Sequence, residues 1–462
     1  MDIDTRTTQI RVQFTTRDDS VQLPEDTGPL LLATGLARLS LSRLVNDLLQ
    51  PEKPIPFEFL VNGRFLRSTI DQFLTDNGLS AEHVLTLEYV RAQIPPQHVT
   101  SFEQDDWIAG VDVYSATSPA AQWSNSNPDT ALIATAGYDG YLRVWNATGS
   151  DVLATSPDAV NGGHKASARA VRFLTADKIA SAGADRTVRV WDYSGDTLTP
   201  SIELYGHTAS IDALAVHAPS NSILSGSTDG NVGLWTTNKA GAPGADADLT
   251  TPFMPSQKRR KTADVRVSKR GPLALMSGHH QAISAVAFKA DDHTVAYSAS
   301  WDKTLRTWDL ATHTLVDTRT TQNALSAMAE MAELGLVAVG SVARHITLVD
   351  VRAGAAAVAA LTLRGHANTV SALAAEPGNK FGLVSGGHDG VCRIWDVRSV
   401  RAEGGGGVGE CVAVVAREKA RQEGKERVKA GAGVKVFDVT WDKEVGIVSV
   451  GEDRRVQINR AG

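Results

Sequence analysis

The sequence predicts a mainly β protein: a β-propeller of seven blades preceded by a small α+β domain. A motif recurs in which Ser or Thr is followed four residues later by Asp and ten residues later by Trp. Its copies lie roughly 40–45 residues apart, a spacing typical of four-stranded blades that bury their faces only by stacking. Ahead of them, residues 8–92 alternate short strand patterns with helical ones.

Seven copies of the motif predict seven blades. A sixth copy keeps Ser449 and Asp453 but has Asn459 in place of Trp, and a seventh, ending at Asp350, has lost all three residues. The five complete copies are Thr135/Asp139/Trp145, Ser181/Asp185/Trp191, Ser225/Asp229/Trp235, Ser298/Asp302/Trp308 and Ser385/Asp389/Trp395.

Gly-His pairs precede four of the copies, and with them the repeats resemble those of the WD-repeat family. The resemblance implies a hydrogen-bonded tetrad inside each blade, which suits the need of buried polar groups for partners. The sets are His164/Ser181/Asp185/Trp191, His207/Ser225/Asp229/Trp235, His279/Ser298/Asp302/Trp308 and His366/Ser385/Asp389/Trp395. An enzyme needs one Ser-His-Asp set. Because this one recurs, we expect a structural role, no catalytic residues and no enzyme.

The first domain, residues 8–92, resembles ubiquitin, with a β-grasp order of strands and helices. A hairpin is predicted from Ile10 to Leu23, followed by a helix with Ser40 as N-cap. The remaining predicted elements are a hairpin over 57–66 with an Asn62-Gly63 turn, a helix over 68–76 closed by Gly78, and a strand carrying Leu85, Leu87 and Tyr89.

Residues 93–97 are predicted to be a linker and residues 98–462 the propeller. The final copy supplies only three strands before the sequence ends. We therefore expect the strand at His98–Phe102 to complete that blade and remove an exposed edge.

Two insertions, at about 238–272 and 401–433, lengthen the spacing and are expected to be loops. The first has a composition typical of disorder and carries a basic cluster, which favours a nuclear import signal over contact with RNA or a solvated loop. Its residues are Lys258, Arg259, Arg260 and Lys261. The second contains a possible exposed helix, and a solvated loop is the favoured interpretation.

Composition points to a soluble intracellular protein. The net charge of −6 argues against a general nucleic-acid binder, and two cysteines cannot form a disulfide framework. The N-terminus is too polar for a signal peptide, and no apolar run is long enough to cross a membrane.

Function is therefore expected on surfaces. In WD-repeat proteins the residue before the repeat Asp lies in a tight turn at one rim, and Tyr138, Trp301 and His388 occupy that position here. An exposed Trp or Tyr on a rigid turn is a good interface anchor. The alternative for Trp301 is packing against a neighbouring blade.

A ubiquitin-like domain in front of seven WD repeats resembles the ribosome-assembly factors related to Notchless, and among them the WD-repeat subunit of the pescadillo complex. Residues 52–67 and 78–96 carry the resemblance in the first domain. It implies a nucleolar and nucleoplasmic protein that binds the propeller of a block-of-proliferation-type WD protein, and through it a pescadillo-type protein, on pre-ribosomal particles. Direct contact with RNA stays open.

The resemblance also implies that a Midasin-type AAA ATPase grips the ubiquitin-like domain through a metal ion. The matching ligand is Glu82, with Ser80 and His83 as flanking contacts. A carboxylate suits Mg²⁺, which the ATPase would supply, since no cofactor is expected on this chain alone. Without the resemblance, Glu82 would be interpreted as a solvated loop charge.

The second candidate function is a substrate receptor of a cullin-based ubiquitin ligase. The sequence WDVR at Trp395–Arg398 resembles the short box of such receptors, although the same letters are frequent at ordinary strand ends.

Overall fold

The computed structural model describes residues 8–24, 27–80, 82–126, 128–149, 151–250, 267–353, 361–403, 406–418 and 434–460. It divides into two compact units, one of residues 1–94 with 397–410 and one of residues 95–396 with 411–462. Within the described ranges, no helix combines the length and apolar character needed to span a membrane.

The first unit has a five-stranded sheet in the order β2-β1-β5-β3-β4, with β1 parallel to β5. Two helices complete it, and α1 buries Leu41 and Val45 in the core of the sheet. The elements are β1 (Gln9–Thr15), η1 (Asp19–Val21), β2 (Leu30–Ala33), α1 (Arg38–Leu49), β3 (Phe57–Val61), β4 (Arg64–Phe65), α2 (Ile70–Asn77) and β5 (Leu85–Arg91).

Two details of this unit differ from the sequence prediction. Val21 lies in the 3₁₀ turn η1, and the strand that returns along β1 is β2, with Val12 opposite Leu30. Helix α1 begins at Arg38 because the carbonyl of Ala37 already accepts the N–H of Leu41, so Ser40 lies inside the first turn and is not the N-cap.

The other local predictions for this unit are confirmed. Asn62 and Gly63 have φ angles of 50° and 76°, as a two-residue hairpin turn requires. Helix α2 is capped by the Thr69 side chain and ends at Gly78, whose φ of 63° permits the left-handed cap.

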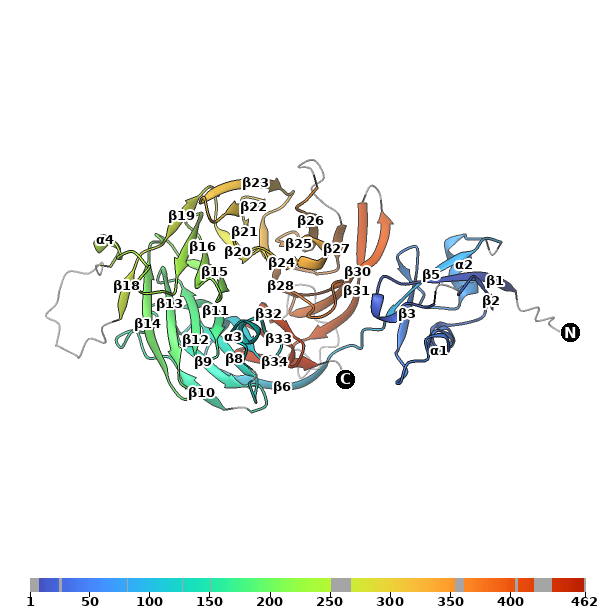
Figure 1. Cartoon of the computed structure of the whole chain (residues 1–462), viewed down its shortest axis with the longest axis horizontal. Coiled ribbons are helices and arrows are strands. Elements are labelled where there is room, and N and C mark those ends of the chain that lie inside the picture. Colours follow the sequence, from blue (N-terminus) through green and yellow to red (C-terminus); the bar gives the residue numbers. More distant parts are fainter. Residues whose placement is uncertain are drawn as a thin grey trace. The chain divides into compact units, whose positions relative to one another are not determined.

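The second unit is a ring of seven blades, which confirms the predicted propeller (Figure 1). A short helix, α3 (Pro119–Ser124), lies between the first two strands of the first blade. The blades are, in order, β7 (Ile108–Tyr114), β8 (Leu132–Gly137), β9 (Leu142–Asn146), β10 (Val152–Thr155); β11 (Ala168–Thr175), β12 (Lys178–Gly183), β13 (Thr187–Tyr193), β14 (Leu198–Tyr205); β15 (Ile211–His217), β16 (Ser222–Ser227), β17 (Asn231–Thr236), β19 (Ala274–Ser277); β20 (Ile283–Phe288), β21 (Val295–Ser300), β22 (Thr304–Asp309), β23 (Thr314–Thr320); β24 (Leu325–Met331), β25 (Leu336–Ser341), β26 (His345–Asp350), β27 (Leu361–Arg364); β28 (Val370–Ala375), β29 (Gly382–Gly387), β30 (Val391–Glu403), β31 (Gly406–Ala416); and β32 (Val436–Asp442), β33 (Gly446–Gly451), β34 (Arg455–Arg460), β6 (Gln97–Glu103). The 3₁₀ turn η2 (Ala332–Leu334) joins β24 to β25.

The ring is closed by the strand that precedes the first blade, as the sequence predicted. Strand β6 pairs antiparallel with β34, from Gln97 opposite Arg460 to Glu103 opposite Arg455. Near the end of β6, the buried ring of Phe102 stacks on Trp145 of the first blade at 5.6 Å between centroids. The last blade therefore has no unpaired third strand, because β6 covers its edge.

Both insertions were predicted to be loops, but their described parts contain regular secondary structure. The prediction is wrong for these parts. The first contains α4 (Ala247–Thr250) and β18 (Ser268–Arg270), which adds a parallel strand to β14. In the second insertion, β30 continues to Glu403 and β31 begins at Gly406. Strand β31 also neighbours β27, so blades five and six form one eight-stranded sheet. Backbone groups that a loop would leave to water are paired in these strands. The basic cluster 258–261 and the possible helix after Arg417 lie outside the described residues.

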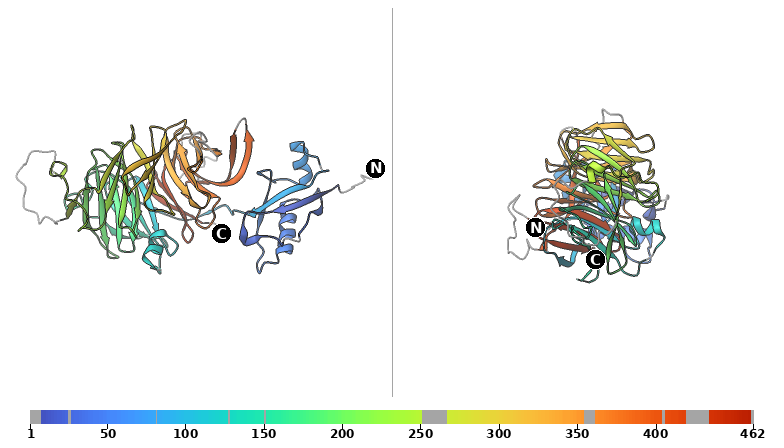
Figure 2. Two further views of the ribbon diagram at one scale, coloured as in Figure 1. Left: turned by 45° about the horizontal axis from the view of Figure 1, so that its top comes forward. Right: turned by 90° about the vertical axis from the view of Figure 1, so that its left-hand side faces the viewer.

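One face of the ring gathers two kinds of loop from each blade. These are the tight turn between the second and third strands and the loop that leads into the first strand of that blade. Backbone hydrogen bonds join them, such as Tyr138 N–H to the Trp107 carbonyl and Trp301 N–H to the Ala282 carbonyl. We call this rim of the propeller the upper face; Figure 2 shows the blades from two further directions.

Candidate interaction surfaces

The four predicted tetrads come together inside blades two, three, four and six. In each, the His Nε2 lies 2.6–2.7 Å from the Ser Oγ, and the Trp Nε1 donates to the same oxygen at 2.7–2.8 Å. The His Nδ1 lies 2.9–3.1 Å from the Asp carboxylate. Every Ser of these sets is fully buried. The hydroxyl oxygens are therefore occupied by structural partners and closed to a substrate.

The tryptophans of the tetrads belong to the core of the ring and to no surface. Trp191, Trp235, Trp308 and Trp395 are each at most 1% exposed. The first three pack in clusters that include apolar residues of the preceding blade, so each indole helps to hold two blades together. Although the repeat pattern singles these residues out as strongly as the turn residues, burial excludes them from contact with a partner. Their role is confined to packing and to the hydrogen bond with the serine.

Electrostatics in the tetrads favour charged carboxylates. Burial by itself would raise the pKa of Asp302, but hydrogen bonds from Thr304 and His279 lower it to about 2. The pKa values of Asp185, Asp229 and Asp389 are likewise lowered, against the opposing effect of burial, by their histidine partners. These carboxylates also accept a backbone N–H from the loop above, as Asp185 does from Lys165. Each tetrad thus ties the upper-face loops to the blade.

Two other blades fill the histidine position with different residues. In the first blade, the Gln104 side chain donates to Thr135 Oγ1 at 2.6 Å, and Trp145 donates to the same hydroxyl. In the seventh, Arg417 reaches Asp453 through Nε at 2.8 Å and Nη2 at 2.5 Å, and its Nη1 donates to Ser449 Oγ at 2.7 Å. The sequence analysis singled out neither Gln104 nor Arg417. Gln104 lies four residues before the first strand of its blade, which is the distance that the histidines keep.

The upper face carries an aromatic patch, which we define as Trp107, Tyr138, His388 and Phe437. Their ring centroids lie 5.5–6.1 Å apart in a chain around the junction of blades six, seven and one. Arg169 packs over the Tyr138 ring at 4.6 Å and donates to its hydroxyl at 2.6 Å. The structure therefore unites two predicted residues, Tyr138 and His388, with two that the sequence did not single out.

Trp301 lies on the upper-face turn of the fourth blade, apart from the aromatic patch. Its side chain is 51% exposed, and none of the described aromatic residues contacts it. This placement favours the interface interpretation over packing against a neighbouring blade.

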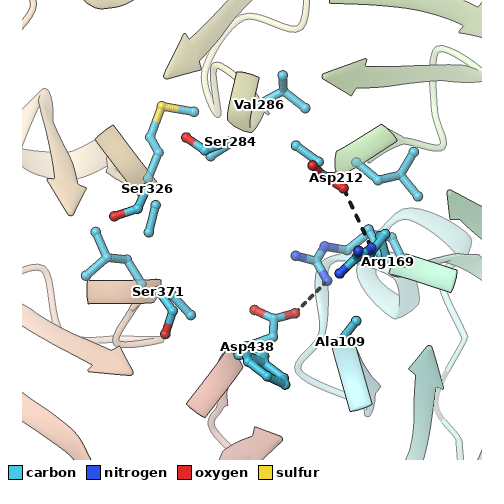
Figure 3. Close-up of a pocket in the computed structure, with 18 residues that line it drawn as sticks. Ala109, Arg169, Asp212, Ser284, Val286, Ser326, Ser371 and Asp438 are labelled. Carbon is cyan, nitrogen blue, oxygen red and sulfur yellow. Dashed lines mark ion pairs between the residues drawn. The ribbon is translucent and has the colours of Figure 1, made fainter. Parts of the chain in front are cut away.

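The central channel is lined by the first strand of each blade and carries charge on one side (Figure 3). Arg169 pairs with Asp212, and Arg172 with Asp438 at 3.7 Å. Behind the channel lining, burial raises the pKa of Asp112 to about 6, although Arg172 opposes the shift. On the other side, the hydroxyls of Ser284, Ser326 and Ser371 donate to carbonyls of the next blade. The polar groups of the channel thus join blade to blade.

In the first unit, Glu82 lies in the loop before β5 and is exposed. Its backbone N–H donates to Ser80 Oγ at 3.2 Å, and its carboxylate has no ion pair among the described residues. His83 is also exposed, and Leu79 and Val84 on either side are 39% and 49% exposed. The loop thus presents a free carboxylate between two apolar side chains.

The WDVR sequence lies within β30, where Trp395 is fully buried and Asp396 is 2% exposed. Trp395 is engaged in the tetrad of the sixth blade. Half of the candidate box is therefore part of the blade interior, which disfavours its use as a docking box.

The fold and these surfaces define a class: a WD-repeat propeller protein with a β-grasp domain in front. Family models agree with it. The NLE (NUC135) domain matches residues 10–74, and the WD domain, G-beta repeat matches residues 112–146, 156–192, 198–236, 270–309 and 359–396.

Curated relatives match almost the whole chain. The ribosome biogenesis protein ytm1 of Aspergillus terreus is 54% identical over 98% of this chain and 96% of its own length. The proteins of the same name from Neosartorya fischeri and Aspergillus niger are 53% and 51% identical, over 98% of this chain and 95% and 94% of their own lengths. The chain belongs to the Ytm1 family of ribosome biogenesis proteins.

Proposed function

We propose that this chain is a non-enzymatic scaffold that acts in assembly of the large ribosomal subunit, in the nucleolus and nucleoplasm. The names of its relatives support a role in ribosome biogenesis. The observation that carries the scaffold role is the contrast between buried and exposed groups. The Ser and His side chains are buried and hydrogen-bonded to one another inside the tetrads, whereas the aromatic patch lies on the upper face.

The aromatic patch is the proposed contact for a block-of-proliferation-type WD protein, which in turn brings a pescadillo-type protein. Trp107 is 38% exposed, and its neighbours are held by the ring contacts and by Arg169. Large aromatic side chains that are already fixed lose little entropy on binding and contribute much contact area. The patch is therefore suited to anchor a stable protein partner.

The ubiquitin-like domain is the proposed handle for a Midasin-type AAA ATPase, whose activity drives release from the pre-ribosomal particle. In this proposal Glu82 completes the coordination of a Mg²⁺ ion held by the ATPase, and the chain binds no cofactor by itself. A free, exposed carboxylate is a suitable ligand for such a hard cation. Leu79 and Val84 supply apolar surface around it.

The test is affinity purification from cell extract of the wild type, Glu82→Gln and Trp107→Ala/Tyr138→Ala proteins. Asp76→Asn, an exposed acid of the same domain, is the matched control. We expect Glu82→Gln to keep the WD partner and precursor RNA but to lose Mg²⁺-dependent capture of the ATPase. We expect the double variant to lose the WD partner. Recovery of cullin adaptors in place of precursors would instead establish the ligase receptor.

A further inference from the structure

The upper-face turns share one backbone position whose occupants divide into two kinds. This is the residue directly after the repeat Asp, or after Ala343 in the fifth blade, and it has a positive φ in every blade. Three blades place glycine there, with φ of 80–83°, and four place a basic residue, with φ of 64–69°. The glycines are Gly140, Gly230 and Gly390, and the basic residues are Arg186, Lys303, Arg344 and Arg454.

Left-handed backbone favours glycine, since any other side chain is strained there. A long basic side chain gives the turn no local advantage over glycine. The charge of Arg186, Lys303 and Arg344 is not used by the turn and is available to a partner. All three side chains are exposed, and none forms an ion pair within the described part of the chain.

These three residues lie in blades two, four and five, and two neighbouring loops add Lys165 and His280, both exposed. We call this set of five residues the basic arc. Two carboxylates are exposed in the same region: Asp158 in the loop before blade two, and Asp212, which faces Arg169.

The rest of the upper face carries charges of both signs. Asp105, 97% exposed, and Asp106 lie in the loop into the first blade. In the seventh blade, Glu452 pairs with Lys435, and Arg454 on the turn is exposed. Positive charge is therefore denser on the arc than on the rest of the face, although the net charge of the chain is −6.

Trp301 distinguishes among possible anionic partners. It stands half exposed next to Lys303 on the same turn, and His280 lies in the adjoining loop of that blade. An aromatic face beside separate basic side chains matches a single strand, in which every nucleotide offers both a base to stack and a phosphate, whereas the carboxylate side chains of an acidic polypeptide have no ring to stack. We propose that the basic arc binds the phosphate backbone of single-stranded RNA, with Trp301 stacking on a base.

The arc and the aromatic patch are different parts of the face, so the proposal stands independently of the proposed function. Its test uses glycine, the residue that three blades already carry at this position. The variant Arg186→Gly/Lys303→Gly/Arg344→Gly removes three charges and relieves backbone strain, so it is expected to melt no lower than the wild type. Arg454→Gly makes the same change in the seventh blade, outside the arc.

Binding of a fluorescein-labelled 20-nucleotide RNA is titrated by anisotropy against the full chain at several salt concentrations. Each phosphate contact to a single strand adds about 0.7 to the magnitude of the negative slope of log K, the association constant, against log salt concentration. Loss of three contacts should lower the slope by about 2 and weaken binding roughly 100-fold at about 0.1 M salt. Arg454→Gly should change affinity by less than about threefold, and Trp301→Ala should weaken it by about tenfold or more.

A further control replaces Lys258, Arg259, Arg260 and Lys261 by serine, because that cluster could bind RNA by itself. The proposal is overturned if the wild type does not bind, if this replacement abolishes all binding, or if Arg454→Gly is as harmful as the triple variant. Equal competition by polyglutamate would also overturn it, since charge alone would then suffice. Retention of the WD partner by the triple variant separates this result from failure of the proposed function.

Discussion

Removal of the Arg417 side chain is expected to destabilise the propeller more than any exposed arginine does. Arg417 is 1% exposed and makes a two-point ion pair with Asp453, together with hydrogen bonds to Ser449 and to the Arg455 carbonyl. In Arg417→Ala, the Asp453 carboxylate stays buried without its counter-charge. Breaking a buried pair from one side costs about 3–5 kcal/mol.

Two comparisons calibrate that value. His366→Ala removes the corresponding partner of Ser385 and Asp389 from the sixth blade, and the unsatisfied groups it leaves cost about 1–3 kcal/mol. Arg352→Ala breaks a pair with Asp350 in which the arginine side chain is 68% exposed, and at most about 1 kcal/mol is expected. The predicted order of destabilisation is therefore Arg417, His366, Arg352.

Urea unfolding of the full chain, followed by tryptophan fluorescence and circular dichroism, measures this order. Because two units are present, coincidence of the two signals has to be checked before midpoints are converted to free energies. Arg417→Ala/Asp453→Asn should recover part of the loss, since the buried charge is then removed too. A loss below about 0.5 kcal/mol for Arg417→Ala, or no recovery in the double variant, would refute the proposed structural role.

Two further outcomes are expected in the propeller. Phe102→Ala removes a buried ring from the closing strand and should lower stability by about 3–5 kcal/mol, with hydrogen exchange in β34 accelerating in parallel; unchanged exchange would contradict the closure. The pKa of Asp302 is lowered in the folded chain, from 3.8 to about 2, so its stabilising effect is complete above pH 4 and is lost as the pH falls toward 2. The wild type should therefore lose stability more steeply than Asp302→Asn over that interval in urea titrations at stepped pH, and parallel curves would contradict this.

The repeat chemistry could be predicted from the sequence because each tetrad is set by short spacings. His366 precedes Val370, the start of its strand, by four residues, and the other three histidines keep that distance. Arg417 binds the Asp and Ser of the seventh blade as a histidine does elsewhere, but it lies far ahead of Val436, where the first strand of that blade begins. The spacing of the repeats therefore could not predict its role. Residues 419–433, which separate the two, lie outside the described part of the chain.

The aromatic patch was predictable only in part. Tyr138 and His388 occupy the turn position that repeats in every blade, so their place on the rim follows from the motif. Trp107 and Phe437 come from near opposite ends of the propeller sequence and meet only because the ring closes. Likewise, the left-handed backbone of Arg186 and Lys303 becomes visible only in the structure.

Closure by β6 has a mechanical consequence. The N-terminal segment of the first unit, which holds the ubiquitin-like domain, ends at Ile94, and two prolines later the chain enters β6, so tension on that domain reaches the ring along the chain at Gln97. The load falls first on the pairing of Gln97 with Arg460, while Phe102, stacked on Trp145, lies toward the far end of the strand. A motor that holds the ubiquitin-like domain would thus also pull on the strand that keeps the propeller shut.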